Sequence, residues 1–172
     1  MQNVSEIDHR AELAAYASGP DRLAEALSGL ADGQLDLSWP GSDVGEWSIR
    51  EIAHHIVDGD ALWTTPVKMA LGEPSGPFSL EWYWSRPQDE WAGRWGYATR
   101  PLASGLALFR ANRAHVVEML ESLPGAWDRG LDVRWPDGRV ATVTVTGIIG
   151  MQGVHALGHV SDILKIRREH GV

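Results

Sequence analysis

The sequence of 172 residues contains no cysteine. This absence excludes a disulfide-stapled scaffold, a thiolate metal site and a cysteine nucleophile, and it is typical of proteins from a reducing compartment. Any thiol chemistry would have to use a thiol that a substrate brings. The chain is long enough to bury a hydrophobic core without disulfides, and we expect a single domain over residues 1–172.

Long apolar runs and an excess of basic residues are missing as well. We find no run of about twenty apolar residues that could span a bilayer, and residues 1–6 lack the basic and apolar regions of a signal peptide. Lys and Arg number 15 against 23 Asp and Glu, which gives a net charge of −8. Such a chain repels a polyanion on average. The sequence therefore predicts a cytoplasmic protein that binds neither membranes nor nucleic acid.

Apolar residues recur at helical spacing in four parts of the chain. The first part covers residues 5–30 and is interrupted by Gly19-Pro20, so that one broken helix or two short helices would fit. Residues 33–45 are rich in turn-forming types and predict a loop. Helical periodicity returns in the middle of the chain, over residues 99–123 and near the C-terminus. The pattern predicts an all-α protein, a four-helix bundle.

The second helix has the clearest start signal. Ser48 and Glu51 have the spacing of a capping box, in which each side chain accepts a hydrogen bond from the backbone amide of the other residue. Trp47 and Ile52 are placed to form a hydrophobic staple around that cap. Pro66 should kink or end the helix, because proline has no amide to donate.

Two adjacent histidines on this helix, His54 and His55, point in different directions. At about 100° per residue, His55 lies at the edge of the apolar arc that runs from Ile49 to Trp63, whereas His54 points nearly opposite. We therefore expect His55, and not His54, to reach the interior of the bundle.

The secondary structure of the connection over residues 72–97 is not determined by a clear pattern. It contains prolines and many aromatic residues, and a connection of this length in a compact domain is usually functional or contains short helices. Its tryptophan-rich segment 78–97 would suit a wall or lid over a pocket, a subunit contact, or ordinary packing. Farther on, residues 131–135 and 139–145 flank Pro136-Asp137-Gly138 and predict a short β-hairpin directly before the last helix.

The last helix carries His155 and His159, which are four residues apart and so lie one above the other on the same face. Residues of buried type share their line. These are Ile148, Gln152, Asp162, Ile163 and Ile166. The pair is therefore predicted to face inward, although two histidines at this spacing also arise by chance as half-buried residues bonded to their neighbours.

His55, His155 and His159 together would supply three neutral nitrogen donors to one point in the bundle core. Three protein ligands leave an open coordination position, as in catalytic zinc sites. A divalent cation lowers the pKa of water or of a thiol enough to produce a nucleophile near neutral pH. Histidine ligation alone does not choose among zinc, nickel, iron and manganese; we expect zinc or nickel first. No general base is predicted.

The chain resembles the DinB/YfiT-like metalloenzymes at two places. Residues 47–56 are similar to the Trp-Ser start of that family's second helix, which has a histidine eight residues after the Trp. Residues 155–159 are similar to its closing His-xxx-His helix. Two positions depart from the family pattern: Gly158 stands where the family often has an aromatic residue or histidine, and Asp162 where it commonly has glutamine.

The resemblance implies an up-down-down-up bundle, often a homodimer, with a divalent metal held by His55, His155 and His159. Characterised relatives include thiol-dependent S-transferases and isomerases that use bacillithiol, mycothiol or glutathione. A metal-dependent transferase or hydrolase that acts on a small molecule, with a low-molecular-weight thiol as partner, is therefore expected. Asp162 is either a hydrogen-bond partner of His159 or a solvated carboxylate.

Three rival interpretations remain at this point. A ferritin-like carboxylate site fits the Glu-x-x-His sequences at residues 6–9 and 51–54, but it needs two further inward glutamates, and Glu51 is already used in the cap. A zincin peptidase needs a glutamate after the first histidine of its motif, and Ala156 stands there. A non-catalytic bundle that binds a small ligand or forms a dimer would contain no metal.

Overall fold

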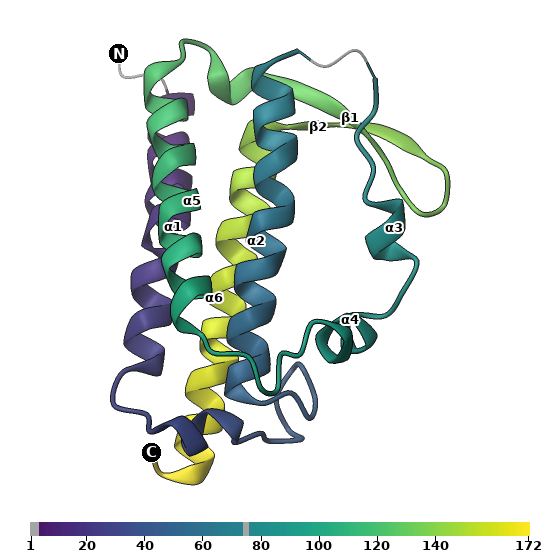
Figure 1. Ribbon diagram of the computed structural model, residues 1–172. Coiled ribbons are helices and arrows are strands. Elements are labelled where there is room, and N and C mark those ends of the chain that lie inside the picture. Colours follow the sequence, from purple (N-terminus) through teal and green to yellow (C-terminus); the bar gives the residue numbers. More distant parts are fainter. Residues whose placement is uncertain (1–3, 74–75) are drawn as a thin grey trace.

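Four long helices form the body of the molecule. The computed structural model describes residues 4–73 and 76–172, with side chains described from residue 9. The helices are α1 (Val4–Leu27), α2 (Ile49–Leu71), α5 (Ala103–Ser122) and α6 (Val145–His170), and they pack side by side (Figure 1). The predicted all-α four-helix bundle is confirmed.

The helices α1 and α6 run in one direction and α2 and α5 in the other (Figure 1). Each of α1 and α2 packs against both α5 and α6. Helices α1 and α2 therefore lie at opposite corners of the bundle, and so do α5 and α6. The 3₁₀ helix η1 (Asp32–Asp36) lies in the first connection, and the long connection before α5 returns the chain to the end of the bundle where α2 began. The up-down-down-up order is confirmed.

Two prolines lie inside the long helices. Helix α1 crosses Gly19-Pro20 without ending, which decides between the one-helix and two-helix interpretations. Helix α2 continues past Pro66 to Leu71, so of the two outcomes expected there, a kink or an end, the end is excluded. At its start, Ser48 and Glu51 form the predicted capping box, in which the Glu51 amide donates to Ser48 Oγ over 3.2 Å and the Ser48 amide donates to Glu51 Oε2 over 2.9 Å.

The predicted hairpin consists of β1 (Gly130–Arg134) and β2 (Val140–Thr144), which pair antiparallel with Leu131 opposite Val143. Gly138 has a φ of +81° in the connecting turn, a conformation that glycine adopts without a steric cost. Thr144 then caps α6 by accepting from the Gly147 amide over 3.1 Å. The hairpin thus sets the position at which the histidine-bearing helix begins.

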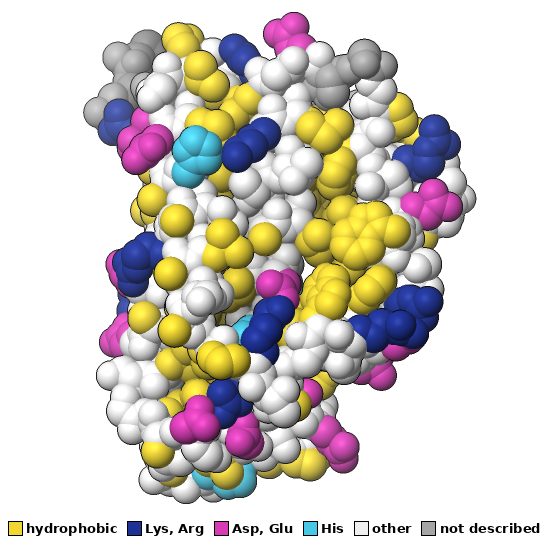
Figure 2. Space-filling view, viewed as in Figure 1, with side chains coloured by type: hydrophobic (Ala, Val, Ile, Leu, Met, Phe, Trp, Pro, Cys, Tyr) yellow, Lys and Arg dark blue, Asp and Glu magenta, His cyan; other side chains and the backbone are white. Residues whose placement is uncertain are grey.

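Residues 78–97 form a separate arm beside α2 that contains the short helices α3 (Glu81–Trp84) and α4 (Gln88–Arg94). We call it the aromatic arm. Its first residue pairs with β1, because the Phe78 amide donates to Asp132 O over 2.7 Å and the Arg134 amide donates to Phe78 O over 2.8 Å. Hydrophobic side chains gather over this arm (Figure 2). No helix in the described part of the chain is long and apolar enough to cross a membrane.

Candidate metal centre

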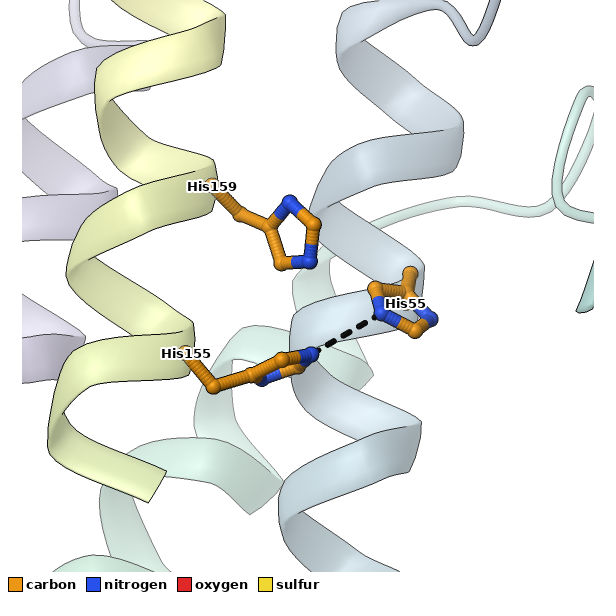
Figure 3. Close-up of side chains that lie close together, drawn as sticks. All are labelled: His55, His155 and His159. Carbon is orange, nitrogen blue, oxygen red and sulfur yellow. Dashed lines mark hydrogen bonds between the residues drawn. The ribbon is translucent and has the colours of Figure 1, made fainter. Parts of the chain in front are cut away.

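The three predicted histidines converge. His55 on α2 faces His155 and His159 on α6, and the three rings point toward one another (Figure 3). The Nε2 atoms of His55 and His155 lie 3.0 Å apart, and the ring centroids are separated by 4.6–4.9 Å. One ligand nitrogen from each residue falls within 4.8 Å of the others. The expected inward orientation of the histidine pair on α6 is therefore confirmed.

The spacing of His55 and His155 fits a shared cation, and a nitrogen of His159 lies within 4.8 Å of both. Two imidazole nitrogens at the usual Zn–N distance and a tetrahedral angle are separated by about 3.3 Å. The separation of 3.0 Å between the two Nε2 atoms is close to that value. Nδ1 of His155 is buried and has no hydrogen-bond partner among the described residues. A ring that presents Nε2 to a cation carries its proton on Nδ1 and usually donates it to a carboxylate, a carbonyl or water. His155 has no such protein partner among the described residues.

Burial keeps all three rings in the neutral form that a cation requires. The pKa of His55 is lowered to about 3, first by burial and then by the neighbouring His155 and His159. The pKa of His155 is lowered to about 4 by burial, by His159 and by the positive charge of Arg113. Burial also lowers the pKa of His159, although Asp162 opposes that shift. Near neutral pH, protons do not compete with a metal for these nitrogens.

Asp162 contacts His159 from one turn farther along α6. Its Oδ2 lies 3.4 Å from His159 Nδ1, its Oδ1 accepts from Lys165 Nζ over 3.1 Å, and the residue is 3% exposed. The contact with His159 lacks the alignment of a full hydrogen bond. The solvated carboxylate is therefore excluded by burial, and Asp162 lies beside His159 as a charged neighbour without a complete hydrogen bond.

A cavity of about 480 Å³ opens over the three histidines. The loop before α2 supplies Asp43 and Trp47, and the start of α4 supplies Gln88 and Asp89. The Trp47 ring meets the His55 ring edge-on, with centroids 5.1 Å apart. Gln88 carries no local sequence signal, because its position depends on the course of the aromatic arm.

His54 was expected to point away from the interior, and this expectation is wrong. The side chain is 0% exposed, because the chain before α5 covers the second face of α2. Its Nε2–H donates to Arg100 O over 2.8 Å, and its Nδ1 accepts from Arg100 Nη2 over 3.0 Å. Arg100 also donates to Asp58 Oδ2 over 2.7 Å. His54 thus holds the chain directly after the aromatic arm and does not join the histidine cluster.

The ferritin-like rival does not fit. Glu51 is held in the helix cap, and both ring nitrogens of His54 are bonded to Arg100. The side chains of Glu6 and Asp8 lie outside the described residues. Among the described side chains, the one group of three or more His, Asp or Glu residues that could hold a metal is the histidine cluster.

Curated relatives of similar length match most of the chain. One is "Putative metal-dependent hydrolase" of Geobacillus thermodenitrificans, 25% identical over 162 residues, which cover 92% of this chain and 84% of the relative. Another is "Putative metal-dependent hydrolase YfiT" of Bacillus subtilis, 26% identical over 155 residues, which cover 88% and 80%. The relatives are named for metal dependence, in agreement with the three-histidine geometry.

The solved structure of YfiT from Bacillus subtilis, described as "a probable metal-dependent hydrolase with an unusual four-helix bundle topology", superimposes with a TM-score of 0.79 at 22% identity. The match covers 99% of this chain and 92% of that one, and it shows that the fold is shared. The family model of the DinB superfamily matches residues 15–163, which include all three histidines. The chain belongs to the DinB superfamily.

Proposed function

We propose that this protein is a divalent-metal-dependent enzyme that acts on a small molecule, with His55, His155 and His159 as the metal ligands. The observation that carries the proposal is the convergence of three neutral imidazoles from two helices on one point. Lowered histidine pKa values in a cavity are typical of functional sites. The names of the relatives support metal dependence but do not identify the metal.

A cation held there would supply Lewis-acid activation of water or a thiol near neutral pH. Three neutral ligands leave its positive charge uncompensated, and the cavity of about 480 Å³ gives a substrate access to it. Zinc and nickel remain the first expectations, because imidazole nitrogen suits both. The chain's own part is to hold the three rings, to keep them neutral by burial, and to shape the cavity.

The nucleophile decides between two reaction classes. The relatives' names suggest hydrolysis, for which a general base usually assists. Among the described residues that line the cavity, the carboxylates are Asp43 and Asp89, both exposed at its rim, and Asp43 already accepts from Lys165 Nζ over 2.7 Å. Water bound to zinc reaches a pKa of about 7, whereas a bound thiol is deprotonated outright and needs no base. This favours thiol-dependent S-transfer or isomerisation, with a low-molecular-weight thiol as the partner.

Metal content tests the proposal directly. Protein purified without a histidine tag and equilibrated with zinc or nickel should hold about one ion per chain by elemental analysis, since the described residues form one three-ligand site. His159→Ala should lose the ion and keep its far-UV circular dichroism. His115→Ala is the matched control, because His115 is exposed on α5 and should keep the ion.

An unloaded wild type under these conditions would contradict the enzyme proposal. It would leave the non-catalytic alternative, in which the cavity binds a ligand without a metal. Turnover by loaded protein would then separate the nucleophiles: thiol consumption supports S-transfer, and thiol-independent release of product supports hydrolysis. The homodimer remains a prediction, and sedimentation would test it.

A further inference from the structure

A second, smaller cavity adjoins the histidines on the side of the aromatic arm. It has a volume of about 150 Å³ and shares His55, His155 and Gln88 with the larger cavity. Most of its walls are apolar or aromatic, and Gln88 and Gln152 add amide groups. The apolar and aromatic walls include Leu62, Trp63, Tyr83, Trp84 and Met151. We call this space the aromatic chamber.

The volume of the aromatic chamber suits one ring. An engineered apolar protein cavity of about 150 Å³ binds benzene. Flat aromatic walls favour stacked or edge-on contacts with a planar group over contacts with a branched aliphatic one. Because His55 and His155 form part of the wall, a ring in the chamber lies beside the point on which the histidines converge.

Contacts behind the walls hold the chamber open. The Trp84 ring stacks on Trp135 in the turn of the hairpin, with centroids 5.4 Å apart and planes 18° from parallel. The Tyr83 ring stacks on Trp91 at 5.9 Å, and Trp91 Nε1 donates to Tyr83 O over 2.7 Å. The walls are thus fixed before a ligand arrives, which reduces the entropic cost of binding.

The charge of the lining restricts the ring further. Among the described residues that line the two cavities, none is Lys or Arg, and the carboxylates are Asp43 and Asp89 at the rim. An anionic group on the far side of the ring would lose its hydration in the chamber and find no cation to replace it. A neutral or cationic ring meets no such penalty.

We propose that the substrate carries one planar, uncharged or cationic ring, which occupies the aromatic chamber while its reactive group reaches the histidines. This substrate class rests on the proposed metal-dependent function. Acetohydroxamate and phenylacetohydroxamate share a metal-chelating head and differ in the ring, so they separate the two proposals. Their affinities for the zinc-loaded protein would be measured by isothermal titration calorimetry.

Phenylacetohydroxamate should bind about tenfold or more tightly than acetohydroxamate, because its ring is buried. A 4-carboxylate on that ring should abolish the gain. Trp84→Ala should bring the ratio of the two affinities toward one without changing acetohydroxamate binding, whereas Trp127→Ala, whose ring stacks on His9 elsewhere, should leave the ratio unchanged. If Trp84→Ala unfolds, Met151→Trp serves instead, since a ring placed at this 38% exposed position fills the chamber and should also remove the gain.

The outcomes separate the two proposals. Equal affinities of both hydroxamates for the wild type, or an undiminished ratio in Met151→Trp, would overturn the aromatic chamber as the substrate site. Failure of acetohydroxamate to bind the zinc-equilibrated wild type would instead overturn the metal site beneath it.

Discussion

Two buried polar clusters lie next to one another on α2 and α6, and they differ in how their polar atoms are used. The first is the histidine cluster. The second joins Asp60 on α2, five residues after His55, to Arg113 on α5, and both side chains are 1% exposed. Both clusters contain buried atoms without a hydrogen bond among the described residues, Nδ1 of His155 and His159 in the first and Oδ2 of Asp60 in the second. The second cluster differs in that it joins opposite charges, and every branch of the Arg113 guanidinium has an acceptor.

The acceptors of Arg113 come from three different helices. Nε donates to Asp60 Oδ1 and Nη2 to Gln152 O, each over 2.9 Å, and Nη1 donates to Tyr16 O. The carbonyl of Tyr16 is free because Pro20, four residues on, has no amide to donate to it. A Cβ at position 19 would lie 2.3 Å from Arg113 Nη1, so only glycine leaves room there. Gly19 and Pro20 therefore do not break the helix: Gly19 leaves room for the buried Arg113 side chain, and Pro20 leaves a carbonyl free to accept its hydrogen bond.

The comparison separates a structural cluster from a functional one. Arg113 and Asp60 compensate each other's charge and connect all four long helices, which fixes their arrangement. The histidines are neutral, contact one another, and keep donor atoms directed at a shared point. Four predictions test this division, in order of expected effect.

Arg113→Met should cause the largest loss of stability. It leaves the Asp60 carboxylate buried without its cation, which costs about 3–5 kcal/mol for a broken buried pair. Urea denaturation should show this loss, while the folded fraction still binds about one metal per chain because the histidines are intact. Arg110→Ala is the control: its pair with Asp21 is exposed, and its loss should cost less than about 1 kcal/mol. A similar loss of unfolding free energy in Arg113→Met and Arg110→Ala would contradict the structural role of the Arg113–Asp60 pair.

Metal addition should show the opposite pattern. A cation that binds only the folded state stabilises it by about 4 kcal/mol at a free concentration about a thousand times its dissociation constant. Wild type and Arg113→Met should both gain this increment in denaturation experiments with zinc, whereas His55→Ala should gain almost none. An equal gain in His55→Ala would mean that the ion binds elsewhere.

The metal-free protein should lose stability as the pH falls. The folded chain holds His55 and His155 with pKa values of about 3 and about 4, whereas the unfolded chain protonates them near 6.5. Between these values the unfolded state binds more protons, so acid favours unfolding, by up to about 1.4 kcal/mol per pH unit for each histidine. Chelator-treated His55→Ala should show a shallower fall between pH 6.5 and 4.5 than His115→Ala. Parallel curves would contradict the burial of a neutral His55.

The features that could be predicted from the sequence are those that local patterns determine, such as helix starts, turns and shared helix faces. Ser48 and Glu51 indicate a helix start, and Pro136-Asp137-Gly138 indicates a hairpin. The four-residue spacing alone places His155 and His159 on one helix face. Each of these signals depends on residues within a few positions of one another. All were found in the structure close to where the pattern put them.

The buried residues that the sequence did not reveal depend on several elements at once. Arg113 is buried because α1, α2 and α6 each bring it an acceptor, and no window of sequence contains those partners. His54 is buried because Arg100 and its neighbours cover a second face of α2, whereas helical periodicity marked only the first face. No single segment contains the aromatic chamber either, since α2, α3, α4 and α6 all contribute to its walls.

Ser48→Ala should have the smallest effect. It tests whether the histidine cluster depends on the start of α2. The variant loses the hydrogen bond that the Glu51 amide donates to Ser48 Oγ, at a cost of about 1 kcal/mol in unfolding free energy. His55 lies two turns inside α2, where packing against α6 holds the backbone, so zinc affinity should change less than about twofold, well within 1 kcal/mol. Calorimetric titration together with urea denaturation measures both quantities. A large loss of zinc affinity would show that the cluster depends on the end of the helix as well as on its packed face.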